Sequence, residues 1–447
     1  MGKKKTGKGE FLKGAAWIAV GGFVAKLIGA LYRIPLTNLI GGKGIGLYQM
    51  VYPVYCLLLT VSATGIPSSI AKLTAERIGR GEDDLPVFRA SMRLFLTVGA
   101  CGTAIMAIVA PYLAKAQGSE EVLGGYYALA PSVLLVSAIS VFRGWFQGRS
   151  KMYPTAFSEI TEQAVKVGFG LAFAYFFRAR IENAVVLLLL AVSLSELVAL
   201  GVMYLLYRRA RTPLKTQNEG GMVGVKTILR LSIPVTFASI LLPISGLVDS
   251  VLAPRLLSAY TTDAVTLYGL FAGGAVTIIN LPVSVCYGIA AASVPAVANA
   301  AARRGKGNSP RKRIFFALLV TVAVALPSAV GLYFFAEPAS KIIFRKLTGE
   351  ELSVLTSLVR TLSVSALGLS LTQTLSACLT AQGKPQYAAL SMLVGVIVKT
   401  ALYLGWLKNA TVSVYGLAYA TNICYFTVAG LNFIFNMLVG RKKKASP

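Results

Sequence analysis

Twelve long apolar stretches run along this chain, and they constrain its fold more than any other feature. A helix needs about 20 mainly apolar residues to cross the hydrocarbon core of a bilayer. The hydrophobic share of 55% and the mean hydropathy of +0.68 are far from those of a soluble domain. The sequence therefore predicts an all-α polytopic membrane protein, with spans at 14–40, 44–71, 90–113, 122–146, 155–177, 184–207, 227–252, 264–298, 313–336, 352–381, 386–407 and 412–439.

The basic residues are distributed unevenly between the connections. The chain carries 44 Lys and Arg against 17 Asp and Glu, a formal net charge of +27. Thirty of the basic residues fall in the two ends and the even-numbered connections, whereas nine fall in the odd-numbered connections. Because Lys and Arg concentrate in cytoplasmic loops, we expect a cell-membrane protein with both termini in the cytoplasm. Topology then explains the basic excess without a nucleic-acid partner.

The longest connection divides the chain into two halves of six spans each. This connection, 208–226, is polar and contains glycine. We expect two six-helix lobes, 1–207 and 227–447, with 208–226 as a cytoplasmic linker.

The two halves contain similar segments. LYQMVYPVY at Leu47 resembles LYGLFAGGA at Leu267, an offset of 220. A second pair, 147–167 and 382–400, aligns Lys166 with Lys399. With six spans per half, such repeats share one orientation and are related by an axis along the membrane normal. Chance similarity between apolar segments is the alternative.

The first span carries two cations on one face. Gly22, Lys26, Gly29 and Arg33 follow the spacing i, i+4, i+7 and i+11, which places them on one side of a helix. A charge at membrane depth costs at least about 2.5–3.5 kcal/mol, so this face is poorly suited to lipid. We expect Lys26 and Arg33 to face water and bind an anion. Snorkelling to the outer interface is the alternative for Arg33.

Two further lysines are candidate substrate ligands. Lys166 follows Glu162 by four residues, the favourable order for a helical ion pair. This spacing predicts a local pair, and a cavity lining is the alternative. Lys399 repeats the position of Lys166 in the second half, without an acid four residues before it.

Three acids are candidates for ion or proton coupling: Glu162, Glu196 and Asp249. Glu196 lies in the middle of its span, where it serves either as a proton site or as a hydrogen-bonding acid between helices. Asp249 lies six residues before Arg255, and we expect these two to form an interface pair.

Signals for an enzyme, a metal or a cofactor are absent from the sequence. It contains no phosphate-binding G-x-x-x-x-G-K-[ST] motif and no His, the commonest general base and metal ligand. The five Cys lie in apolar stretches without ligand spacing. We expect a protein that is not an enzyme and binds no metal or cofactor.

Two segments resemble a known family. AKLIGALYRIPLTNLIGGKGIGLYQMVYPVYCLLLTVSATGIPSSIAKL at 25–73 is similar to the opening of stage V sporulation protein B-like transporters. FRGWFQGRSKMYPTAFSEITEQAVKV at 142–167 is similar to their central cytoplasmic segment. These transporters belong to the multidrug/oligosaccharidyl-lipid/polysaccharide exporter superfamily, together with lipid II flippases and polysaccharide exporters. The resemblance covers nearly the whole chain.

The resemblance implies two six-helix lobes around a central cavity and transport by alternating access. It also implies an anionic cargo, a polyprenyl-pyrophosphate-linked sugar such as a peptidoglycan precursor, held by Lys26 and Arg33. Cell-wall synthesis proteins are the expected partners besides membrane lipid. Flippases carry arginines on helices two and eight, whereas 44–71 and 264–298 carry none.

Three other functions are alternatives. An exporter of polysaccharide or teichoic-acid units would use the same chemistry. A multidrug cation antiporter of the same fold would have an acidic cavity. A membrane-bound glycosyl-polymer ligase or polymerase would have a large outer loop with catalytic side chains, and no such loop is present.

Overall fold

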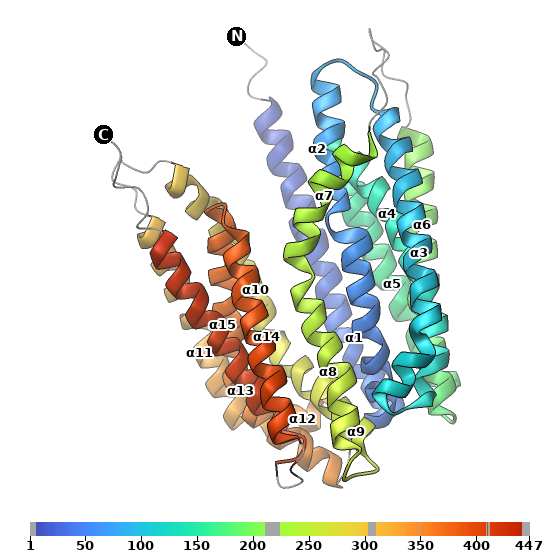
Figure 1. The fold of residues 1–447 in the computed structure, drawn as a ribbon, viewed down its shortest axis with the longest axis vertical. Coiled ribbons are helices and arrows are strands. Elements are labelled where there is room, and N and C mark those ends of the chain that lie inside the picture. Colours follow the sequence, from blue (N-terminus) through green and yellow to red (C-terminus); the bar gives the residue numbers. More distant parts are fainter. Residues whose placement is uncertain are drawn as a thin grey trace. The chain divides into compact units, whose positions relative to one another are not determined.

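A computed structural model describes residues 6–210, 224–302, 310–347, 349–407, 409 and 412–439. The described part is helical and contains no extended sheet (Figure 1). Its helices are α1 Thr6–Leu59, α2 Ile66–Gly79, α3 Leu85–Gln117, α4 Leu123–Gly148, α5 Tyr153–Phe176, α6 Ile181–Ala210, α7 Val225–Ser239, α8 Leu241–Leu257, α9 Ala264–Gly269, α10 Val276–Ala302, α11 Pro310–Phe334, α12 Ala336–Ile343, α13 Gly349–Ala381, α14 Pro385–Trp406 and α15 Tyr415–Val439. Two π-helical segments, η1 Thr60–Thr64 and η3 Leu270–Ala275, and a short 3₁₀ segment, η2 Glu120–Val122, complete the order.

Each expected span coincides with a helix or with consecutive helices, and the chain is a multi-pass membrane protein. By length and composition alone, nine segments of the described residues are apolar enough to cross a membrane. The first two spans form one of these segments, Leu27–Gly79. The helix α5 is not among the nine because it carries Glu159, Glu162 and Lys166. The pair α7–α8 is not among them because a break divides it into helices of 15 and 17 residues.

A one-residue break at Gly41 separates the first two spans. The sequence suggests a short connection at 41–46, but helical structure runs from Thr6 to Leu59 with Gly41 alone outside helical geometry. Gly41 has φ 70° and ψ −173°, a conformation that favours a residue without a Cβ atom. The two spans are therefore joined by a kink.

A second break lies within the expected span 227–252. α7 ends at Ser239, and α8 begins at Leu241 with Pro243 in its first turn. Proline has no backbone N–H, so Pro243 cannot donate to the carbonyl of Ser239 as a continuous helix requires. The helix restarts with Ile244 N–H donating to the carbonyl of Ile240 at 3.0 Å.

The chain forms two compact units. The N-unit comprises Met1–Ile40 and Met50–Leu247, and the C-unit comprises Gly41–Gln49 and Val248–Pro447. The division between them lies inside α8 rather than in the connection 208–226. The short segment 41–49 belongs to the C-unit although spans one and two lie largely in the N-unit.

Close backbone packing explains why 41–49 belongs to the C-unit. A Cβ atom on Gly46 would overlap the backbone carbonyl of Val265, and one on Gly269 would overlap the carbonyl of Gly42. The Gln49 side-chain amide donates to the carbonyl of Ala272 at 2.9 Å. The segment that begins the first repeated motif thus packs on α9 and η3, which carry the second.

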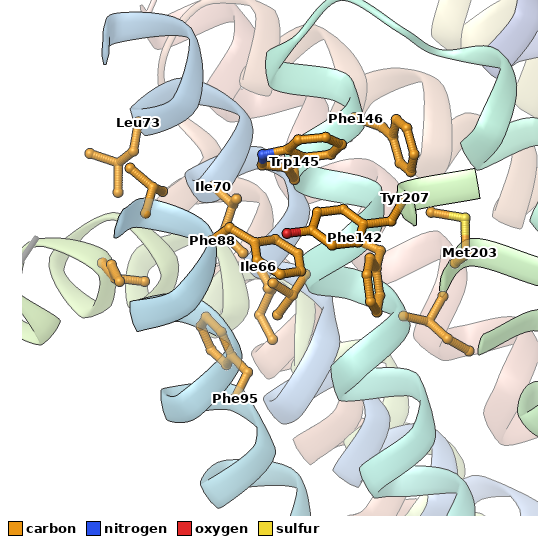
Figure 2. Close-up of a cluster of buried hydrophobic side chains, with 14 of the residues drawn as sticks. Ile66, Ile70, Leu73, Phe88, Phe95, Phe142, Trp145, Phe146, Met203 and Tyr207 are labelled. Atoms are coloured by element: carbon orange, nitrogen blue, oxygen red, sulfur yellow. The ribbon is translucent and has the colours of Figure 1, made fainter. Parts of the chain in front are cut away.

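An aromatic cluster holds together one end of the N-unit (Figure 2). The rings of Phe88 from α3 and Tyr207 from α6 stack at 4.5 Å, and Trp145 from α4 meets Tyr207 edge-on at 5.0 Å. Aliphatic side chains of α2 complete the cluster, among them Ile66 and Ile70. Such rings bury large apolar areas, so four helices are fixed at this point.

A buried ion pair closes the same end of the N-unit. Arg149 donates to both carboxylate oxygens of Asp84, at 2.6 and 2.8 Å, and the Asp84 side chain is 0% exposed. The guanidinium also lies 4.0 Å from the centroid of the Trp145 ring. The segment 142–149 therefore attaches the end of α4 to the connection between α2 and α3.

We predict that Arg149→Ala lowers the free energy of unfolding by about 3–5 kcal/mol, because it leaves the Asp84 carboxylate buried without its partner. Thermal unfolding of the purified protein in detergent micelles measures the change. Lys72→Ala is the matched control: it removes an ion pair to Glu76 of 3.9 Å whose side chains are 59% and 46% exposed. The control should cost at most about 1 kcal/mol. Equal losses in the two variants would contradict this assignment.

Candidate functional site

Four of the predicted site residues gather in the N-unit. Arg33 comes from α1, Glu162 and Lys166 from α5, and Glu196 from α6. Lys166 interacts electrostatically with each of the other three. We call these four residues the N-unit cluster. The side chain of Lys26 lies outside the described part of the structure.

Glu196 occupies a buried position in the N-unit cluster. Its side chain is 1% exposed, and one carboxyl oxygen accepts a hydrogen bond from the Tyr55 hydroxyl. The other oxygen, Oε2, has no hydrogen-bond partner among the described residues. Tyr55 lies in the second span, so this contact joins that span to α6 within the N-unit.

Glu162 pairs with a residue that the sequence does not suggest. The expected pair with Lys166 is wrong: the Glu162 carboxylate binds Arg143 of α4 at 3.0 Å. Arg143 also donates to the Ser158 hydroxyl at 3.0 Å and lies 4.0 Å from Glu159. It thereby satisfies the acidic residues of α5 from a neighbouring helix.

This pairing removes Glu162 as the ion-pair partner of Lys166. Within the described residues, no carboxylate lies within 4.0 Å of the Lys166 ammonium. Arg33 adds a second cation, from α1. Arg33 and Lys166 both interact electrostatically with the Cys56 thiol.

The C-unit neutralises its own buried lysine. The Lys399 ammonium of α14 lies 2.7 and 2.9 Å from the two carboxylate oxygens of Asp249 of α8. The side chains are 4% and 19% exposed, and the ammonium lies 5.7 Å from the centroid of the Tyr403 ring. The expected pair of Asp249 with Arg255 is wrong, because Asp249 faces α14 and Arg255 is exposed.

One sequence difference between the repeated segments accompanies the contrast between the two lysines. At the offset of 220 that relates the repeated motifs, Asp249 corresponds to Gly29. A Cβ atom on Gly29 would lie 3.2 Å from the Gln163 side-chain oxygen, so this glycine faces α5 as Asp249 faces α14. The N-unit thus has no carboxylate at the position from which the C-unit neutralises Lys399.

Two participants, Arg143 and Tyr55, are missed by sequence reasoning. Arg143 counts among the cytoplasmic cations in the charge asymmetry, although it lies five residues inside the end of α4. In the sequence, the position of Arg143 about one turn before the end of an apolar helix indicates that it has a partner within the membrane. Tyr55 gives no such signal because tyrosine is common in membrane helices.

The described residues contain no group of three or more Cys, Asp or Glu side chains placed to hold a metal ion. Cys56 is partly buried, and Cys286, Cys378 and Cys424 are buried as free thiols. The arrangement offers charge and hydrogen bonds to a ligand.

We predict strong coupling between Lys399 and Asp249 in a double-mutant cycle. Lys399→Met and Asp249→Asn should each cost about 3–5 kcal/mol of unfolding free energy, since each leaves an unpaired buried charge. The double variant should cost less than the sum. The Glu337–Lys341 pair serves as the control cycle, because its distance is also 2.7 Å while its side chains are 51% and 57% exposed. Additive losses at Lys399 and Asp249 would contradict the pairing.

Comparisons with known proteins agree with this fold. Stage V sporulation protein B of Bacillus subtilis is 25% identical over 426 residues, covering 92% of this chain and 81% of that protein. Lipid II flippase MurJ of Bacillus subtilis is 21% identical over 428 residues, covering 89% and 78%. An inward-facing multidrug resistance MATE family transporter of the MOP superfamily has a similar structure, with a TM-score of 0.79 and 17% identity over 94% of this chain and 96% of that one. The family model described as polysaccharide biosynthesis protein matches residues 11–301, and the chain belongs to that family of membrane transporters.

Proposed function

We propose that this protein is a flippase that moves a polyprenyl-pyrophosphate-linked saccharide, such as a peptidoglycan precursor, from the inner to the outer leaflet. The Lys166 ammonium, which has no carboxylate within 4.0 Å among the described residues, carries this proposal. The similarity to stage V sporulation protein B and to a lipid II flippase supports the class of cargo.

The charges of the N-unit suit a pyrophosphate. Arg143 neutralises Glu162, whereas Lys166 has no carboxylate within ion-pair distance among the described residues. Arg33 supplies a guanidinium and Lys166 an ammonium. Both groups form strong charge-assisted hydrogen bonds with phosphate oxygens. Lys26, which shares the helical face of Arg33, is a further proposed ligand. Lys399 is a weaker candidate because Asp249 already satisfies it.

The membrane potential favours the proposed direction. An inside-negative potential stabilises outward movement of an anion by about 2.3 kcal/mol per charge per 100 mV. Coupling to an ion or proton adds a second driving force if an acid titrates during transport. Glu196 is the proposed coupling residue, since Glu162 and Asp249 are held in ion pairs.

The cation antiporter is the less suitable reading. The similarity to the MATE transporter concerns the fold, and a cationic drug would be repelled by Arg33 and Lys166. A polysaccharide or teichoic-acid unit is the second candidate cargo, favoured by the description of the matched family. Proteins of cell-wall synthesis, which make the cargo and use it, are the proposed partners.

We predict that Lys166→Gln slows flipping by about ten-fold or more, the effect of losing a charge-assisted hydrogen bond. Sealed vesicles containing the purified protein and a lipid-linked saccharide give the rate as the saccharide reaches the opposite leaflet. Lys166→Arg should retain part of the rate, and Lys26→Ala should reduce it as Lys166→Gln does. The control is Lys151→Gln, which removes an exposed cation from the connection between α4 and α5. Wild-type flipping by Lys166→Gln would exclude Lys166 as a ligand.

The charge asymmetry of the connections predicts the orientation of the protein. In a variant without the five native cysteines, a cysteine at Asn218 should react with an impermeant maleimide only from the cytoplasmic side. A cysteine at Ser119 should react only from the outside. Labelling of Asn218→Cys from outside would overturn the proposed orientation and the direction of transport.

A further inference from the structure

A groove in the C-unit is lined by none of the residues of the proposed transport site. Its volume is about 460 Å³, and it lies among α11, α13 and α15. The polar residues that line it are Tyr333, Ser357, Arg360, Thr361, Tyr419 and Asn422. Arg360 lies on α13, a helix apolar enough to span a membrane, and is exposed.

The floor of the groove is internally satisfied. The Asn422 side-chain amide donates to the carbonyl of Thr361 at 2.8 Å and accepts a hydrogen bond from the Ser365 hydroxyl. The Thr361 hydroxyl donates to the carbonyl of Ser357 at 2.9 Å. These bonds fix the facing surfaces of α13 and α15 and leave few donors on the floor.

The rim of the groove presents donors that are not used within the protein. Among the described residues, the Arg360 guanidinium has no carboxylate within 4.0 Å, because nearby Glu337 binds Lys341 at 2.7 Å. The hydroxyls of Ser357, Tyr333 and Tyr419 make no hydrogen bond to any described residue. A cation and three hydroxyls thus converge on one space that contains no carboxylate, which is the chemistry of an anion site.

Aromatic residues place the groove near a membrane–water interface. Trp406 packs edge-on against Tyr419 at 6.4 Å, and Tyr333 lies beside Phe334 at 5.4 Å. Trp and Tyr gather at the level of the lipid headgroups. Phe334 and Phe335 are 70% and 67% exposed where α11 meets α12, as expected for side chains in contact with lipid.

The charges around α12 fit the same level of the membrane. The hydrogen bond from Lys341, with a smaller contribution from Arg360, lowers the pKa of the Glu337 carboxyl below its usual range. Arg360 is therefore close enough to the water-exposed α12 to act on its charges. Three of the nine basic residues assigned to the outer connections lie here: Lys341, Arg345 and Lys346.

We propose that this groove binds the phosphate of an outer-leaflet glycerophospholipid, with Arg360 as its main ligand and Ser357, Tyr333 and Tyr419 as hydroxyl donors. The acyl chains lie along the apolar surfaces of α11 and α13. The planar guanidinium matches two phosphate oxygens, which a mobile surface lysine does not. The proposal goes beyond the transport function and does not depend on the cargo.

Lipid binding to the purified, delipidated full chain tests this proposal. Native mass spectrometry compares phosphatidylglycerol with diacylglycerol of the same acyl chains, which lacks the phosphate. We expect phosphatidylglycerol to bind at least about ten-fold more tightly, and Arg360→Gln to remove that preference. Arg255→Gln, which removes an exposed cation at the end of α8, should bind as the wild type does.

Further variants and ligands separate the groove from general effects. Ser357→Ala and Tyr419→Phe remove one donor each and should weaken phosphatidylglycerol binding by a few-fold, while the melting temperature stays unchanged. Equal binding of the two lipids, or wild-type binding by Arg360→Gln, would overturn the proposal. Tighter binding of a polyprenyl phosphate than of phosphatidylglycerol would also overturn it, as would displacement of phosphatidylglycerol by millimolar inorganic phosphate.

Discussion

A charge at membrane depth needs a counter-charge, a hydrogen-bonding partner or water, and the polar contacts of this protein follow from that requirement. Arg143 pairs with the acids of α5, Tyr55 donates to one carboxyl oxygen of Glu196, and Asp249 pairs with Lys399. Each contact joins two different helices, so the same interactions that neutralise charge also fix the helices within each unit. Lys166 differs from these residues, since it has no carboxylate at ion-pair distance among the described residues.

The two units meet this requirement differently at equivalent positions. Lys166 and Lys399 align in the repeated segments, and both lie in helices that follow a short turn. The C-unit places Asp249 against its lysine, whereas the N-unit has Gly29 at the corresponding position. A lysine that is already held in a buried ion pair contributes little net energy to the binding of a ligand. A buried cation without a counter-charge attracts an anion strongly. The two lysines therefore differ in whether a carboxylate lies at ion-pair distance among the described residues.

Local sequence properties predict the helices well but not their partners. Hydropathy depends on about 20 consecutive residues, so all twelve spans could be located, and the charge of the connections gave a basis for orientation. The break at Gly41 could not be predicted because the sequence GGKGIG also suits a longer connection between two helices. Predicting the break after Ser239 would have required the exact position of Pro243 in the helix. Ion pairs were the least predictable feature. Asp249 and Lys399 lie 150 residues apart, and their contact depends on the tertiary arrangement of α8 and α14.

Gly29 allows the most direct test of the proposal that Lys166, which has no carboxylate at ion-pair distance among the described residues, binds an anionic lipid. Gly29→Asp would give Lys166 the carboxylate that Lys399 already has, and Gly29→Asn is a control of the same size without the charge. Binding of a polyprenyl-pyrophosphate-linked saccharide to the purified variants is the measurement. The account predicts that Gly29→Asp weakens binding by about ten-fold or more relative to Gly29→Asn. Equal affinity of the two variants would contradict it, because the added carboxylate would then not compete with the ligand for Lys166.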